Sequence, residues 1–117
     1  GPSQPLLEAI ETAPDRQSFT FRPDMAEAKF YHDCPPGTLD YALARLTPQP
    51  ILPQATAITL GENYANTTRR YIRCTEDRAI PPEYQATMAS GWRDCIDLPS
   101  AHSPFFAMPE ALARALQ

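Results

Sequence analysis

The pattern of apolar and polar residues in the second half of the chain alternates between strand-like and helix-like segments. Three short segments are rich in β-branched, aromatic or cysteine side chains and are predicted to be strands: residues 56–60, 69–75 and 93–99. Two other segments are predicted to be helices: residues 81–90, which begin with prolines suited to a first helical turn and stop before Gly91, and residues 108–117. Strand, helix, strand, helix at this spacing predicts βαβ units, and therefore an α/β fold with a parallel sheet.

The first part of the chain, residues 1–47, has a different pattern. Apolar residues recur at helical spacing in residues 6–10, while polar and phenylalanine side chains alternate in residues 18–23. Residues 38–46 follow a Pro-Pro-Gly break and carry apolar residues on one helical face, so we expect a helix there. Three prolines within residues 47–55 predict a linker or crossing loop between the two parts.

Length and composition limit the function classes that fit the chain. At 117 residues it is at most one modest domain, and 43% hydrophobic with 21% charged residues is ordinary for a globular chain. A net charge of −4 and the lack of a basic stripe argue against a nucleic-acid partner. No apolar run approaches the roughly 18 to 20 residues of a membrane span, so we expect no membrane partner.

The cysteines indicate a reducing environment. Cys34, Cys74 and Cys95 are odd in number and have no CxxC spacing, which fits neither a zinc site nor a disulfide framework. We expect buried free thiols and a cytoplasmic location. Cys74 and Cys95 fall on adjacent predicted strands and could approach each other, but a thiol within a strand is expected to belong to the core rather than to act as a nucleophile.

Two polar residues lie just past the ends of successive predicted strands. Asp77, in a Glu76-Asp77 pair that we expect to be exposed, follows residues 69–75, and His102 follows residues 93–99. Because neighbouring parallel strands lie about 4.8 Å apart, an aspartate and a histidine at matching strand ends can form a hydrogen bond. Aspartate before histidine is also the order of these residues in α/β-hydrolases. From spacing alone, an equally good interpretation is that Asp77 is a solvated turn residue and that His102 is a polar residue at the start of a helix.

The resemblance to a known family favours the catalytic interpretation. Three segments carry it: "FYHDCPPGTLDYALARLTPQP", "RRYIRCTEDRAIPPEYQ" and "SAHSPFFAMPEALARAL". They resemble the C-terminal half of the α/β-hydrolase branch that contains plant methylesterases, hydroxynitrile lyases and bacterial pyrethroid-type carboxylesterases. The resemblance implies that Asp77 is the triad acid, that His102 is the general base and that Glu76 is not catalytic. It further implies that residues 1–47 are the later part of the lid and its return helix, and residues 48–117 the C-terminal part of the α/β-hydrolase core.

The chain departs from the family pattern because it contains no G-x-S-x-G and therefore no nucleophile elbow. We expect the nucleophilic serine to come from an N-terminal half supplied by another chain, by a segment outside this sequence or by a swapped copy. The chain alone should then be inactive toward a small-molecule ester. Two alternatives remain: a hydroxynitrile lyase, although Ser103 stands where similar lyases tend to carry lysine, and a non-catalytic interaction module.

Several other residues are candidates for roles around this site. Phe19, Phe21 and Met25 are predicted to contact an apolar acyl or alcohol group if they lie in the lid. Phe105 could line the mouth of the pocket, although packing of the last helix is an equal interpretation. His32 is expected to be a packed or hydrogen-bonded histidine rather than a second base. Ser-His-Asp acyl transfer requires no cofactor and no metal, and we expect neither.

Overall fold

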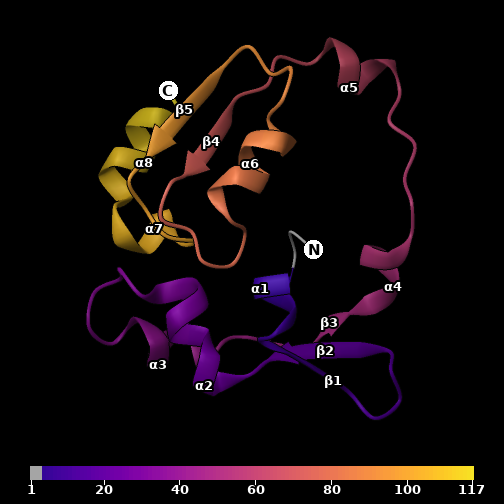
Figure 1. Ribbon diagram of the computed structural model, residues 1–117, viewed down its shortest axis with the longest axis vertical. Coiled ribbons are helices and arrows are strands. Elements are labelled where there is room, and N and C mark those ends of the chain that lie inside the picture. The colour runs from indigo at the N-terminus through magenta and orange to yellow at the C-terminus, as the bar shows by residue number, and fades with distance from the viewer. Residues whose placement is uncertain (1–3) are drawn as a thin grey trace.

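Two parallel strands near the end of the chain lead into the loops that contain Asp77 and His102 (Figure 1). The computed structural model describes residues 4–117. Strand β4 (Tyr71–Cys74) pairs in parallel with β5 (Cys95–Leu98), in register from the first residue of each to the last. Helix α6 (Pro82–Met88) connects them. The predicted βαβ unit is therefore confirmed.

The last two helices pack beside this strand pair. They are α7 (Pro104–Ala107) and α8 (Pro109–Ala115), so the helix predicted at the end of the chain is confirmed. Arg70, just before β4, links the strand pair to the end of α8. Its Nε lies 2.7 Å from Asp94 Oδ2, and its Nη1 donates to the carbonyl of Ala115 at 2.6 Å. A cation is well placed there because the C-terminus of a helix carries a partial negative charge.

A second, antiparallel sheet forms the lower part of the molecule in Figure 1. After α1 (Gln4–Leu7), strands β1 (Ile10–Thr12), β2 (Ser18–Phe21) and β3 (Gln49–Pro50) pair in the order β1-β2-β3. The alternation in residues 18–23 thus does produce a strand. The helical spacing around residues 6–10 does not continue as far as expected, because Ile10 pairs with Phe21 in the sheet.

Three helical segments lie between β2 and β3 in the chain: α2 (Pro23–Ala26), the π-helical η1 (Glu27–Tyr31) and α3 (Thr38–Leu43). The predicted helix at residues 38–46 is confirmed, although it ends earlier. The main cluster of buried apolar residues is built here from Ala26, Phe30 and Ala79. Because Ala79 comes from the loop after β4, the core joins the two halves of the chain.

Residues 47–60 differ from the sequence-based prediction. The expected linker at residues 47–55 contains β3 and α4 (Ile51–Ala55), and the strand expected at residues 56–60 is absent. Residues 56–60 are extended or irregular, and Ile58 is 78% exposed. A β-branched segment becomes a strand only where a neighbouring strand pairs with it, and none of the strands in residues 4–117 does so.

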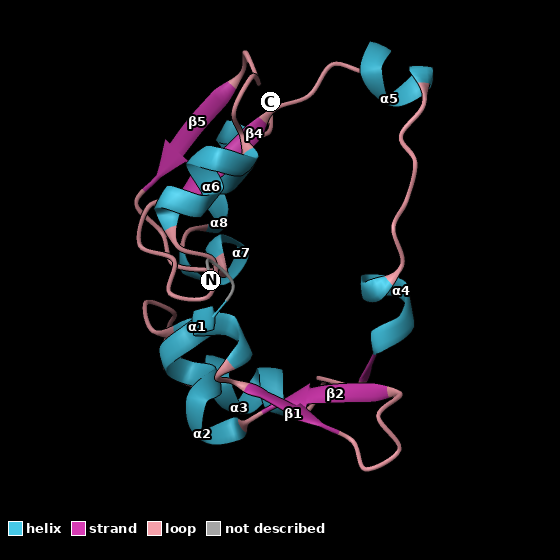
Figure 2. Ribbon diagram, turned by 45° about the vertical axis from the view of Figure 1, so that its right-hand side comes forward, coloured by secondary structure: helices cyan, strands magenta, loops and turns pink. Residues whose placement is uncertain are grey.

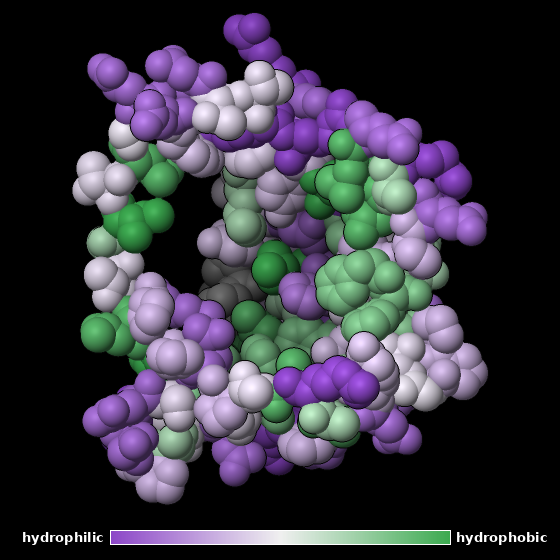
Figure 3. Space-filling model, turned by 180° about the vertical axis from the view of Figure 1, so that it is seen from behind, coloured by the Kyte–Doolittle hydropathy of each residue, from purple (hydrophilic) through white to green (hydrophobic). Residues whose placement is uncertain are grey.

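Residues 52–66, which end with α5 (Glu62–Asn66), form an arc that stands away from the rest of the molecule (Figure 2). The radius of gyration is 15.7 Å, whereas a compact domain of this length has about 13 Å. Viewed from behind, apolar surface lies along the arc and around the opening that it encloses (Figure 3). Leu52, Ile58, Leu60 and Tyr64 are large apolar residues exposed along the arc.

Candidate active site

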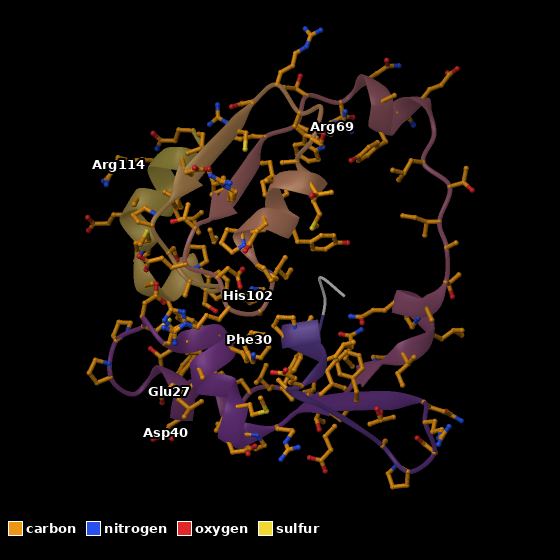
Figure 4. All side chains as sticks on the ribbon, viewed as in Figure 1. Glu27, Phe30, Asp40, Arg69, His102 and Arg114 are labelled. Atoms are coloured by element: carbon orange, nitrogen blue, oxygen red, sulfur yellow. The ribbon has the colours of Figure 1, made fainter. Side chains whose placement is uncertain are left out.

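Asp77 and His102 are hydrogen-bonded to each other. Asp77 lies in the loop after β4 and His102 in the loop after β5, and His102 Nδ1 is 2.9 Å from Asp77 Oδ2. The two loops meet because parallel, in-register strands end at the same edge of the sheet. Figure 4 shows His102 between the parallel pair and the helices below it, close to Phe30. The sequence-based expectation that these residues meet is confirmed.

The surroundings of Asp77 correct one expectation from the sequence. The Glu76-Asp77 pair is not exposed as a pair, because only 8% of Asp77 is accessible whereas Glu76 is exposed. Asp77 Oδ1 accepts the backbone N–H groups of Ala79 at 2.8 Å and Ile80 at 2.9 Å. A short acidic side chain that bonds to the backbone two and three residues ahead forms a tight Asx-type turn.

These contacts keep Asp77 ionised. Burial alone would raise the pKa of Asp77, but the hydrogen bonds from His102, Ile80 and Ala79 outweigh it and hold the pKa below its ordinary value. The ionised carboxylate is a pure acceptor, so His102 Nδ1 must carry the proton that joins them. His102 Nε2 is then the basic nitrogen of the ring.

Gln85 is a supporting residue that the sequence reasoning missed. It lies on α6, is 4% exposed, and its Oε1 accepts the Cys74 N–H at 2.8 Å while Nε2 donates to the Cys74 carbonyl at 3.0 Å. Nε2 also donates to the Ile80 carbonyl at 2.8 Å and lies 3.4 Å from Asp77 Oδ2. Gln85 and Ala89 lie four positions apart and are both buried, which the residue types in the sequence do not indicate.

The two loops are also joined through their backbones. The Thr75 N–H donates to the Leu98 carbonyl and the Glu76 N–H to the Ser100 carbonyl, each at 3.0 Å. Ser100 is fully buried, and its hydroxyl donates to the carbonyl of Ala101 at 3.0 Å. The ladder of the parallel pair therefore continues past the strands as far as the residues that flank Asp77 and His102.

An aromatic row leads from the antiparallel sheet to His102. The ring of Phe21 packs edge-on against Phe30 at 4.7 Å between centroids, and Phe30 lies 5.2 Å from the His102 ring. Phe19 is buried and packs on Phe21 at 5.6 Å. The structure thus brings two of the residues predicted to contact substrate toward His102 through Phe30, which the sequence reasoning did not single out.

Two other predicted substrate contacts lie differently. Met25 is half-buried on α2. Phe105 is 57% exposed and packs on Phe106, which in turn packs against Tyr31 and Tyr41. A role for these side chains in substrate binding stays a prediction.

The thiols do not form a second site. Burial raises the pKa of Cys74 to about 11, and burial together with Asp33 raises that of Cys34 to about 11, so both are protonated at neutral pH. Cys74 is buried as expected, but Cys95 is exposed. The in-register pairing places Cys95 opposite Tyr71 at the other end of the ladder, which corrects the expectation that Cys74 and Cys95 could approach each other.

No three potential metal ligands converge in residues 4–117. In the same residues, no helix is long and apolar enough to cross a bilayer.

A sequence profile described as the alpha/beta hydrolase family matches residues 1–115. The chain belongs to the alpha/beta hydrolase family. Two curated relatives from Arabidopsis thaliana are similar: methylesterase 17 is 30% identical over 119 residues, which is 96% of this chain and 40% of the relative, and methylesterase 7 is 28% identical over 94% of this chain and 45% of the relative. The chain therefore spans less than half the length of the curated relatives it matches.

Solved structures show the same fold. A pyrethroid hydrolase from Sphingobium faniae JZ-2 superposes with a TM-score of 0.84 at 22% identity, over 97% of this chain and 47% of that one. Polyneuridine aldehyde esterase superposes with a TM-score of 0.81 at 20% identity, over 99% of this chain and 50% of that one. The α/β-hydrolase fold, in part, is therefore confirmed, and the relatives are of the esterase type.

Proposed function

We propose that this chain supplies the acid and the base of a Ser-His-Asp triad in a carboxylic-ester hydrolase. Asp77 is the acid, His102 is the base, and the nucleophilic serine comes from a segment outside these 117 residues. The observation that carries the proposal is the 2.9 Å bond between His102 Nδ1 and Asp77 Oδ2, at matching ends of two parallel strands.

The geometry suits a general base. With its Nδ1–H donated to Asp77, His102 accepts the serine proton at Nε2 as the serine oxygen attacks the ester carbonyl carbon. The imidazolium then gives that proton to the departing alcohol oxygen as the C–O bond breaks, which leaves an acyl-serine. Water attacks the acyl group while His102 takes a proton from the water, and His102 then returns this proton to the serine oxygen as the acyl–serine bond breaks, which releases the acid and the free serine. Asp77 stabilises the imidazolium in both steps.

The substrate class follows from the relatives and the aromatic row. The similar proteins named as methylesterases and as an aldehyde esterase support a small ester as the substrate. Phe19 and Phe21, connected to His102 through Phe30, would offer an apolar surface to the acyl or alcohol group. Met25 and Phe105 are further candidates for contacts at the entrance. In this proposal residues 1–47 form the later part of the lid and its return helix, and residues 48–117 belong to the core.

The open architecture supports the view that a further half completes the enzyme. Each strand of the parallel pair is bonded only to the other within the part of the chain that the structure describes, so the outer edges are free to pair. Leu52, Ile58 and Leu60 are exposed along the arc, as expected for apolar residues that another segment covers. We propose that this segment is the N-terminal half of the same enzyme, which carries the nucleophile.

A serine-directed fluorophosphonate probe tests the proposal on the natural full-length protein. We expect covalent labelling of one serine, and we expect His102→Ala to abolish it because the serine then lacks its base. Labelling that is absent from the folded wild-type protein would favour the non-catalytic interaction module instead.

A further inference from the structure

Two consecutive residues bind the loops that carry Asp77 and His102. His32 and Asp33 directly follow η1. His32 Nε2 lies 3.1 Å from the carbonyl oxygen of Glu76, and Asp33 Oδ2 accepts the backbone N–H of Ala101 at 2.8 Å. We call this dipeptide the clamp. The expectation that His32 is a hydrogen-bonded histidine is confirmed.

The two partners of the clamp occupy equivalent places in their loops. Glu76 immediately precedes Asp77, and Ala101 immediately precedes His102. One residue of the clamp therefore holds the peptide before the acid, and the next holds the peptide before the base. The clamp directly follows η1, so it fixes both loops relative to the helical segment that lies between β2 and β3 in the chain.

The chemistry of each contact identifies its donor. A carbonyl oxygen only accepts, so His32 Nε2 carries a proton and donates to Glu76. The Asp33 carboxylate accepts from a backbone N–H, and such charge-assisted bonds are short and strong. Ala101 is fully buried, and removing Asp33 would take away the acceptor that its N–H bonds to. Asp33 is thus the stronger half of the clamp.

The clamp is itself held in place. The N–H of Cys34 donates to the carbonyl of Tyr31 at 3.0 Å, which closes the turn after η1. Tyr31 packs against Phe106 on α7, the helix that follows His102. The turn that presents Asp33 is therefore packed against the same segment whose backbone Asp33 binds.

We propose that Asp33 is a positioning residue for the base of the triad. By holding the Ala101 N–H it fixes the loop so that His102 Nδ1 stays on Asp77 and Nε2 faces the nucleophile. His32 acts in the same way, with a smaller effect, on the loop of Asp77. This inference rests on the proposed function, since it assigns a role in positioning the proposed base.

Steady-state kinetics of the natural full-length protein with 4-nitrophenyl acetate test the inference. Misplacing a catalytic group by about 1 Å can cost about 100-fold in rate, so we expect Asp33→Ala to lower kcat by about 10- to 100-fold. KM should change little because Asp33 does not touch the substrate. Asp33→Asn should keep most of kcat, since the amide oxygen can still accept the Ala101 N–H. Asp40→Ala, which removes an exposed carboxylate on α3, is the control and should leave kcat unchanged.

A double mutant separates positioning from other effects. In the His102→Ala background, Asp33→Ala should cause no further loss, because the group it positions is gone. A further tenfold loss there, an unchanged kcat for Asp33→Ala, or an equal loss for the Asn and Ala variants would each overturn the inference. If Asp33→Ala does not fold, Asp33→Ser removes the same bond, because its oxygen lies one bond closer to its own backbone, and the same criteria apply.

Two different results would refute the proposed function and the role of Asp33. An unchanged kcat for His102→Ala would refute the proposed function itself. A large loss for His102→Ala together with wild-type kinetics for Asp33→Ala would refute the role of Asp33 alone.

Discussion

Asp77 and Glu76 are neighbours in the chain, yet their carboxylates lie in opposite environments. Asp77 is buried and bonded to His102 and two backbone N–H groups, whereas the side chain of Glu76 is exposed. The backbone of Glu76 nevertheless serves the site, because its N–H binds Ser100 and its carbonyl binds His32. Two residues that composition cannot distinguish therefore have separate roles: one supplies a carboxylate and the other a backbone link.

Gln85 should contribute to the stability of the acid loop. Gln85→Met would leave the buried Cys74 N–H and the Ile80 carbonyl without their partner, and one such loss costs about 1–3 kcal/mol. We expect a decrease of that size in the free energy of unfolding of the full-length protein, measured by urea denaturation. Gln17→Met, the same change at an exposed site outside the arc, is the control, and an equal effect of both variants would contradict the role of Gln85.

The pH dependence of stability should report the ionised state of Asp77. Its native pKa lies below the ordinary value of 3.8, so the ionised form stabilises the fold above that pH, and this stabilisation is lost as the pH falls through the lowered native pKa. The difference in unfolding free energy between wild type and Asp77→Asn should therefore be fully present at about pH 5 and shrink below 3.8. A difference that has already vanished at about pH 5 would show that the native pKa is not lowered.

The thiols should differ in reactivity. Cys95 is exposed, whereas the pKa values of Cys34 and Cys74 are raised to about 11, so few of their thiolates exist at neutral pH. We expect iodoacetamide to modify Cys95 first in the native full-length protein, as followed by mass spectrometry. All three should react at similar rates in denaturant. Preferential modification of Cys34 or Cys74 in the native state would mean that their surroundings have been misassigned.

The isolated 117-residue chain should not behave as a stable monomer. Its parallel strands have free outer edges and its arc exposes apolar side chains, so we expect aggregation, partial unfolding or self-association. Size-exclusion chromatography with light scattering, together with thermal unfolding by circular dichroism, measures this directly. A monodisperse monomer with one cooperative transition would show that the chain needs no further half to fold.

The sequence predicted the parts of the site that depend on local pattern. The strands before Asp77 and His102 are short and apolar, and the helix between them makes the pair parallel, so the meeting of the two residues follows from topology. The resemblance then distinguished Asp77 from Glu76, which the pattern alone did not.

The contacts around the pair could not be predicted because they join residues far apart in the chain. Asp33 and Ala101 are 68 positions apart, and nothing near either residue in the sequence indicates the other. The strand expected at residues 56–60 does not form for a related reason: the segment has a strand-like composition but no neighbouring strand to pair with. The antiparallel sheet was missed as a whole because two of its strands are only two or three residues long.

The most direct test of the account compares Asp77→Asn with Glu76→Gln in the natural full-length protein. Both changes replace a carboxylate by an amide at adjacent positions. We expect Asp77→Asn to lower kcat for 4-nitrophenyl acetate by about 10⁴-fold, because the amide favours the wrong imidazole tautomer. Glu76→Gln should change kcat by about twofold at most, because its side chain is exposed. Equal effects of the two substitutions, or a larger effect of Glu76→Gln, would contradict the assignment of Asp77 as the acid of the triad.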